Sequence, residues 1–469
     1  MNELLKAAAR FCWTITLFGA SQLGETFSRR DPYRATAAFD AVTRATEGEL
    51  GDVLKRVFQA GDRLQQGLCD LAPALLTPGA YTSRGMMRTS LKVVQQSAAV
   101  LGALAPSVEA RASLQEFQNK LEVFDLFENV DTVLRIPRGV SVPLAQLVEH
   151  ASGRDTFTAV WATEGIGHFF AETIWEANGT PRGLLQGTAA RSVPARTLAA
   201  LHAGMGLSVA NRILARVKSQ SSQCHTSCDL PGALMQFLAL CRDNSTEGYV
   251  GAAYEAMGLV ARNLYPHMVN HLHTHLSEMG EALTEYFWHG VGRGIYFSPI
   301  NYFPLGSSSF QAMEMARREP PDERSRGNAL AGLVWAQLLV NLRQPEIVEG
   351  LLAECSGPFE AGAFANGVSS ATVIWRDSTD GDPHLEALCR YRPQTLQPEL
   401  AARWRELVEI PCRRALDEYY DILKDHDCVG EVFRVRPLPQ LMRDLRTADN
   451  PAKGQSSAGG SANDYETTS

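Results

Sequence analysis

The sequence resembles itself at a spacing of about 125 residues, and this feature most constrains its fold. At an offset of 125, residues 164–168 (EGIGH) fall on residues 289–293 (HGVGR). At an offset of 126, residues 203–207 (AGMGL) fall on residues 329–333 (ALAGL). Two matches at nearly one offset indicate an internal duplication. We therefore expect two copies that pack about a pseudo-twofold axis.

The matched segments are rich in glycine and lie within sequence that is predicted to be helical. Glycine in a helix interior costs about 1 kcal/mol relative to alanine, so something must offset that cost. Close approach of a neighbouring backbone or of a ligand is the usual reason. A dinucleotide-binding fingerprint needs its glycines between a strand and a helix. Residues 283–289 read as helix, so the sequence argues against a Rossmann site.

The apolar spacing predicts a mainly α-helical protein. We expect a helical module at 1–125, the duplicated core at 145–355 and a C-terminal helical part at 356–446. A Gly/Ser/Ala-rich tail at 447–469 is typical of disorder. Two finer predictions concern a helix that ends at Pro266 and a long regular helix over 267–289. Residues 371–375 (ATVIW) are the one strand-like run.

Composition narrows the class of protein. The 469 residues are 45% apolar and 20% charged, which is ordinary for a globular protein. The net charge of −8 argues against a nucleic-acid partner or an anionic membrane surface. Nine cysteines without a repeating framework favour a reducing compartment, so we expect a cytoplasmic protein. No run is long enough for a transmembrane segment. Residues 1–22 could be a weak targeting segment, although an amphipathic helix is the preferred interpretation.

Five segments together resemble an uncharacterised bacterial family whose genes lie beside enediyne polyketide synthases. They are 164–165 (EG), 203–207 (AGMGL), 247–249 (EGY), 290–297 (GVGRGIYF) and 327–335 (GNALAGLVW). His289 stands where the family pattern has an acidic residue. The resemblance covers about residues 150–345 and implies natural-product biosynthesis with a polyene or polyketide-derived partner. It supplies no catalytic residues.

Pairs of glutamates eight residues apart are one candidate site. Glu164 and Glu172 are echoed by Glu247 and Glu255, and in helices such a pair lies on one face about 12 Å apart. Two acids that face a cavity can serve as general acid/base groups or stabilise a cation. The alternative is helix capping, because Thr followed by Glu is typical of a helix N-terminus. Capping is the preferred interpretation.

The duplication also predicts a central polar cluster. Glu164 and His168 match His289 and Arg293, and two copies about a pseudo-twofold axis would bring all four side chains together. Such a cluster inside an apolar shell suits proton transfer. The alternative is a buried Glu–Arg or Glu–His pair that sets how the copies dock.

Three histidines on one predicted helix are the candidate metal ligands. His267, His271 and His275 follow at intervals of four, and His271 with His275 could bind a metal together with Glu164 or His168. Histidines beside an apolar seam are more often solvated, so a metal is not favoured and no cofactor is predicted.

These observations lead to one preferred function and two alternatives. The preferred function is a biosynthetic enzyme that acts on a hydrophobic small molecule, a polyene or polyketide derivative. Its acid/base or cation-stabilising chemistry would take place in an apolar cavity between the copies. The catalytic candidates are Glu164, His168, Glu247, His289 and Arg293. The alternatives are a non-catalytic carrier or scaffold within a complex of biosynthetic proteins, and a metal-dependent oxidoreductase.

Overall fold

A computed structural model gives the structure of most of the chain beyond residue 107. The described residues are 108–128, 130–134, 136, 142–223, 229–298, 301, 308–393 and 398–448. The predictions for most of the N-terminal module, for residues 1–22 and for nearly all of the tail lie outside them. All of these described residues belong to one compact unit.

The described residues form helices and no strands, so the all-α prediction is confirmed. The first half holds α5 (Val108–Glu128), α6 (Val130–Val133), α7 (Leu144–Ser152), α8 (Thr156–Asn178), α9 (Gly187–Arg191), α10 (Leu198–Gln223), α11 (Leu230–Asp243) and α12 (Val250–Leu264). The second half holds α13 (Val269–Met279), α14 (Glu281–Tyr296), α15 (Ser308–Arg318), α16 (Glu323–Val340), α17 (Val348–Glu354), α18 (Gly357–Ser378), α19 (Pro383–Arg390), α20 (Pro398–Trp404), α21 (Ile410–Arg414), α22 (Tyr420–Asp425) and α23 (Leu438–Ala448).

Short helical turns of other kinds join these elements. They are the 3-10 turns η1 (Ala195–Thr197), η2 (Pro266–Met268), η4 (Pro345–Ile347) and η7 (Val429–Phe433), and the π-helical turns η5 (Arg405–Glu409) and η6 (Ala415–Tyr419). The helix predicted to stop before Pro266 does so, since α12 ends at Leu264.

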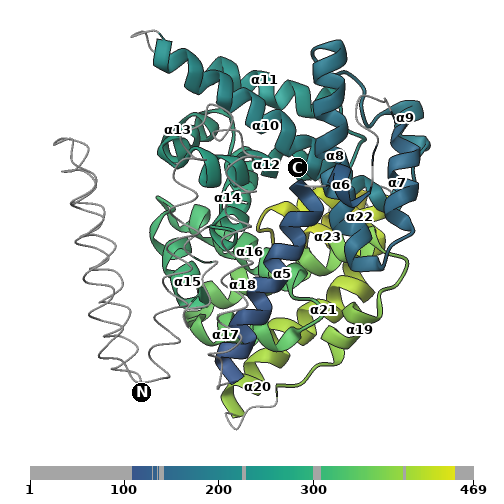
Figure 1. The fold of residues 1–469 in the computed structure, drawn as a ribbon. Helices are drawn as coiled ribbons and strands as arrows, with labels where there is room; N and C mark the ends of the chain where they lie inside the picture. Colours follow the sequence, from purple (N-terminus) through teal and green to yellow (C-terminus); the bar gives the residue numbers. More distant parts are fainter. Residues whose placement is uncertain are drawn as a thin grey trace, which may run out of the picture. The chain divides into compact units, whose positions relative to one another are not determined.

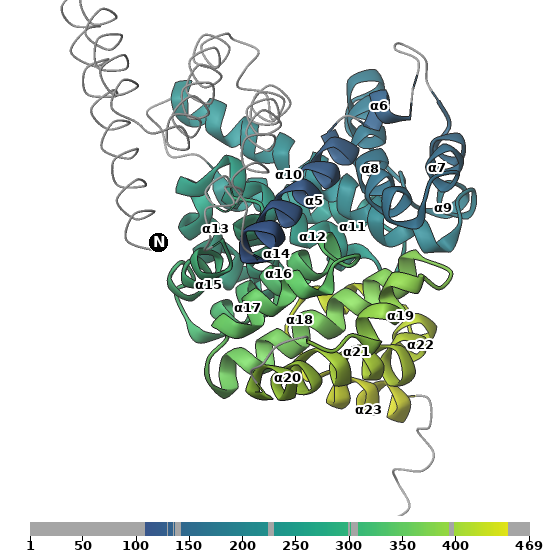
Figure 2. The same ribbon diagram turned by 60° about the horizontal axis from the view of Figure 1, so that its bottom comes forward.

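Six long helices form the centre of the fold as a row. α8, α10, α12, α14, α16 and α18 each pack on the next, and the five later ones follow one another down the molecule (Figures 1 and 2). α12 and α14 run in the same direction, because Glu255 lies against Gly290 and Arg262, two turns on, lies against Gly294. Shorter helices such as α11 and α13 return the chain between members of the row.

The row curls, so helices far apart in sequence meet. The ring of Phe157, at the start of α8, lies 6.1 Å from that of Trp375, near the end of α18. α5 packs against both α8 and α16 (Figure 1). The turn η7 packs against α12, α14 and α18. The predicted boundaries at 125 and 356 thus lie among helices that pack together.

The structure shows where the two pairs of matched sequence segments lie in the row. The matched segments lie on α8 and α14, and on α10 and α16, so each match links helices three places apart. The described helices show similar contacts at each step, and two separate copies are not shown. The duplication and its pseudo-twofold axis stay predictions.

Two local predictions were wrong. The expected helix over 267–289 is divided at Gly280, whose φ of 151° is one that side-chain-bearing residues rarely adopt. The strand-like run at 371–375 lies inside α18 and is buried. Its β-branched residues pack among the neighbouring helices, and that packing overrides their weak preference for strands.

One described helix is long and apolar enough to cross a membrane. It spans residues 195–220, and 78% of its most apolar window is buried inside the fold.

Candidate functional site

A buried cluster of charged side chains lies where α8, α12 and α14 come together. Arg293 Nη2 donates to Glu164 Oε1 at 2.8 Å, and Arg293 Nη1 donates to Glu255 Oε2 at 2.9 Å. His289 Nδ1 lies 2.8 Å from the other oxygen, Oε1, of Glu255. The four residues are between 0 and 6% exposed. We call these four residues the Arg293 cluster.

Glycines let the helices approach closely enough to build this cluster. A Cβ atom on Gly290 would lie 2.0 Å from the carbonyl oxygen of Glu255, and one on Gly204 would lie 1.8 Å from that of Glu164. Both contacts are far inside van der Waals distance, so these positions require glycine. His289 and Arg293 are four residues apart on α14 and therefore share one face. The backbone contact at Gly290 brings that face within reach of Glu255.

The charges of the cluster stabilise one another. Burial opposes the charge of Arg293, but the carboxylates of Glu164 and Glu255 outweigh it and raise the pKa of the guanidinium above its usual value. Burial alone would raise the pKa of Glu255, but Arg293 and His289 hold it below its usual range. Glu255 is therefore ionised, and the ring N–H at Nδ1 of His289 donates to it.

Three nitrogen atoms at this place are buried without a hydrogen-bond partner in the described part of the chain. They are Nε2 of His289, Nε of Arg293 and Nε1 of Trp335. The Arg293 guanidinium lies 4.6 Å from the centre of the Trp335 ring, and the His289 ring lies 6.2 Å from it. Buried polar atoms are normally paired, so each exception requires an explanation. Here three exceptions gather in one group of touching side chains.

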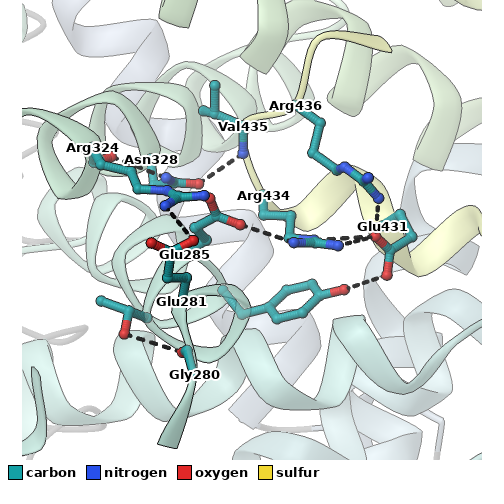
Figure 3. A network of polar contacts seen from close by, with 11 residues as sticks. Gly280, Glu281, Glu285, Arg324, Asn328, Glu431, Arg434, Val435 and Arg436 are labelled. Carbon is teal, nitrogen blue, oxygen red and sulfur yellow. Dashed lines mark hydrogen bonds and ion pairs between the residues drawn. The ribbon is translucent and has the colours of Figure 1, made fainter. Parts of the chain in front are cut away.

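The C-terminal segment Val429–Arg436 covers the Arg293 cluster, and we call it the cover segment. The Phe433 ring stands edge-on to the His289 ring, with centroids 5.8 Å apart. Figure 3 shows how polar contacts anchor the segment to α14 and α16. Arg434 donates to Glu285 at 2.9 Å, and the Val435 N–H donates to Asn328 at 2.7 Å.

The structure brings together some of the residues that the sequence predicted for the site. Glu164 binds Arg293 directly, and His289 is joined to Arg293 through Glu255. His168 is half-buried, with its ring 5.2 Å from that of Phe127 on α5.

Glu247 lies outside the cluster, and Glu255 takes the place predicted for it. Glu247 is exposed on the loop before α12. Glu255 is fully buried and binds both His289 and Arg293. The available sequence signal was the spacing of eight residues that Glu247 and Glu255 share with Glu164 and Glu172. The signal pointed to the right pair and did not say which member is buried.

The capping interpretation was wrong at both sites. Glu164 lies in the interior of α8, which begins at Thr156 and is capped by Asp155 through the Thr158 N–H. Thr246 precedes α12 but its hydroxyl donates to the carbonyl of Leu185. The apolar residues before position 163 extend the helix upstream, so Glu164 lies in the helix interior, where it binds Arg293.

The three histidines proposed as metal ligands, His267 in η2 and His271 and His275 in α13, do not converge. His271 is exposed, and His275 Nδ1 lies 3.3 Å from a carboxylate oxygen of Glu278. Glu164, one proposed further ligand, binds Arg293 instead. Among the residues described, no group of three or more His, Cys, Asp or Glu is placed to hold a metal ion.

Two of the hollows formed by the described residues open near the row, and neither is the apolar cavity expected between copies. One, of about 200 Å³, lies between the start of α8 and the end of α18. The other, of about 250 Å³, lies beside His273, Glu281 and Arg324. Both carry many polar lining residues, and neither is lined by a member of the Arg293 cluster.

Comparisons with known proteins found no relative of this chain. The chain matches no protein-family model, no curated protein and no solved structure. The class that the fold defines is an all-α protein built on a curled row of helices.

Proposed function

We propose that this protein is a natural-product biosynthesis enzyme in which His289 is the acid/base group. The observation that carries the proposal is the difference between the two ring nitrogens of His289. Nδ1 is held by the ionised Glu255, and the buried Nε2 has no partner among the described residues. A carboxylate that fixes one nitrogen sets the tautomer and directs the other toward a reacting group.

The other members of the cluster have distinct roles in this proposal. Glu255 positions the imidazole through its contact with Nδ1. Arg293 directs an unpartnered Nε–H into the same apolar surroundings, where a fixed positive charge stabilises developing negative charge more strongly than in water. Glu164 holds Arg293 from the α8 side. His168 and Glu247 lie outside this arrangement and receive no role.

The surroundings support a hydrophobic substrate. Trp335 and Phe433 flank the His289 ring, and both are buried. The five segments that resemble the enediyne-associated family lie in or directly before α8, α10, α12, α14 and α16, which are successive members of the row. This resemblance is the basis for a polyene or polyketide-derived substrate. Because the cluster is closed, a substrate reaches it when the cover segment moves Phe433 aside.

The test compares His289 with a buried acid on another helix. His289→Gln and Asp377→Asn are introduced at the native locus, and the pathway products are quantified by liquid chromatography and mass spectrometry. Asp377 is a matched control because it is 2% exposed and ion-paired with Lys424, yet lies on α18 outside the cluster and the cover segment. We expect His289→Gln to lower product at least about 100-fold, as loss of an acid/base group does. Unchanged product from a folded His289→Gln protein overturns the proposal.

A carrier or scaffold within a biosynthetic complex is the second candidate. The near-complete burial of the Arg293 cluster favours it, because a structural role, fixing how the helices dock, is enough to account for a buried ion pair. Native mass spectrometry of wild-type and His289→Gln protein separates the two functions. A carrier retains its bound polyene in both proteins with product unchanged. An enzyme retains substrate in the variant while product falls.

A further inference from the structure

The hollow between α8 and α18 is a second candidate site, independent of the Arg293 cluster. It has a volume of about 200 Å³ and is lined from the start of α8, the start of α10 and the end of α18. Two arginines border it, Arg154 just before α8 and Arg196 in η1. These cations come from segments far apart in sequence, so the fold itself brings them to one hollow.

Ser378 gives this hollow a buried polar group that lacks a partner. Its side chain is 8% exposed, and its Oγ has no hydrogen-bond partner in the described structure. Other lining hydroxyls are already used: Thr163 donates to the Ala159 carbonyl and Thr197 to the Pro194 carbonyl, each at 2.7 Å. Ser378 therefore has a hydroxyl proton that no described group accepts.

The charges in the hollow suit an anion. Arg154 Nη2 donates a hydrogen bond to the Val133 carbonyl at 3.0 Å. This bond orients the guanidinium and leaves its other N–H groups for a bound anion. Arg196 is paired with Asp380, which also lines the hollow. Thr156 is the first residue of α8, so the N-terminus of this 23-residue helix, which Asp155 caps, borders the same space.

We propose that this hollow binds a phosphate group, either free or as the ester of a small molecule. Arg154 and Arg196 supply forked, charge-assisted donors, and Ser378 supplies the third donor. A tetrahedral phosphate accepts bonds from several directions, which suits donors that arise from three elements. In the unliganded protein Arg196 is ion-paired with Asp380. When phosphate binds, Arg196 leaves this carboxylate and pairs with the phosphate.

The role of Asp380 gives a test that misfolding cannot imitate. Removing its charge by Asp380→Asn frees Arg196 and removes a repulsive carboxylate, so phosphate binds more tightly. Arg196→Gln and Arg154→Gln each weaken binding, and Ser378→Ala weakens it less. Arg318→Gln is the matched control, because Arg318 is 81% exposed and pairs with Glu314 away from the hollow.

The measurement is isothermal titration of the full chain with inorganic phosphate, glycerol phosphate and acetate at constant ionic strength. We expect about a tenfold loss of phosphate affinity for each arginine variant, the scale of one charged hydrogen bond. We expect a gain of several-fold for Asp380→Asn. Tighter binding of glycerol phosphate than of inorganic phosphate identifies an ester as the ligand, and the reverse identifies free phosphate. The proposal fails if wild-type protein binds neither, if acetate binds as tightly, or if the arginine variants match Arg318→Gln.

Discussion

Glu164 and Arg293 are 129 residues apart in the chain and are joined by a hydrogen-bonded ion pair of 2.8 Å. The pair links α8 to α14, helices that are separated in the row by α10 and α12. This ion pair can form because the row curls and because Glu255 binds the other side of the Arg293 guanidinium. A charge buried with two carboxylates is a strong determinant of how the helices pack.

Replacement of Arg293 by methionine is expected to destabilise the protein severely. The change leaves the carboxylates of Glu164 and Glu255 buried without their cation, and breaking a buried ion pair from one side costs about 3–5 kcal/mol. Urea unfolding monitored by circular dichroism measures the loss. Arg318→Met, at an exposed position, should change the free energy of unfolding by less than about 0.5 kcal/mol. Equal stability of the two variants would show that the cluster does not hold the helices together.

Two glycine-to-alanine changes should have opposite effects. At Gly290 the new methyl would lie 2.0 Å from the Glu255 carbonyl oxygen, so α12 and α14 must separate, and we expect a loss of about 3 kcal/mol or more. At Gly362, exposed in α18, nothing lies within 4 Å of the new methyl. Alanine is the better helix former there and should stabilise the protein by about 1 kcal/mol. Thermal and urea unfolding of the two variants check both signs, and a neutral Gly290→Ala contradicts the close contact.

His202 should make stability depend on pH. Burial lowers the pKa of this histidine from 6.5 to about 4, and its Nε2 accepts the Thr246 N–H, a bond that protonation would break. The neutral ring is favoured in the folded protein. Its contribution is therefore complete above pH 6.5 and is lost as pH falls from 6.5 to about 4. The expected loss is on the order of 3 kcal/mol.

Urea unfolding at pH 7, 5.5 and 4.5 measures this dependence for wild type and His202→Gln. Glutamine cannot take up the proton, so the variant should lose less stability across this interval. Parallel pH curves for the two proteins would assign the acid sensitivity to other groups, such as Glu255, whose lowered pKa acts at more acidic pH.

Much of the local structure could be predicted because it depends on neighbouring residues. The helix that ends before Pro266 follows from the geometry of proline. The glycines of the matched segments were predicted to allow close approach, and Gly290 against Glu255 confirms it. The errors at Gly280 and at 371–375 are also local. A single glycine conformation divided one helix, and burial against other helices outweighed a strand-like composition.

The site was predictable in part. The glutamate spacing and the matched segments drew attention to Glu164, His289 and Arg293, and the structure joins these three. The sequence placed His168 and Glu247 beside them and left Glu255 as a partner of secondary interest. Which acid of an i, i+8 pair is buried depends on where the neighbouring helix crosses, and that crossing is set by contacts at Gly290 and Gly258.

The sequence by itself determined that this chain is helical and that something must approach its glycine-bearing helices closely, either a neighbouring backbone or a ligand. Periodicity and the absence of a Cβ atom are properties of single segments, so they can be read without the fold. Only the tertiary structure decided that Glu255 joins the Arg293 cluster and that Ser378 faces a hollow with Arg154 and Arg196. Those pairings depend on the curl of the whole row, which sums many weak packing preferences and has no signature in any one segment.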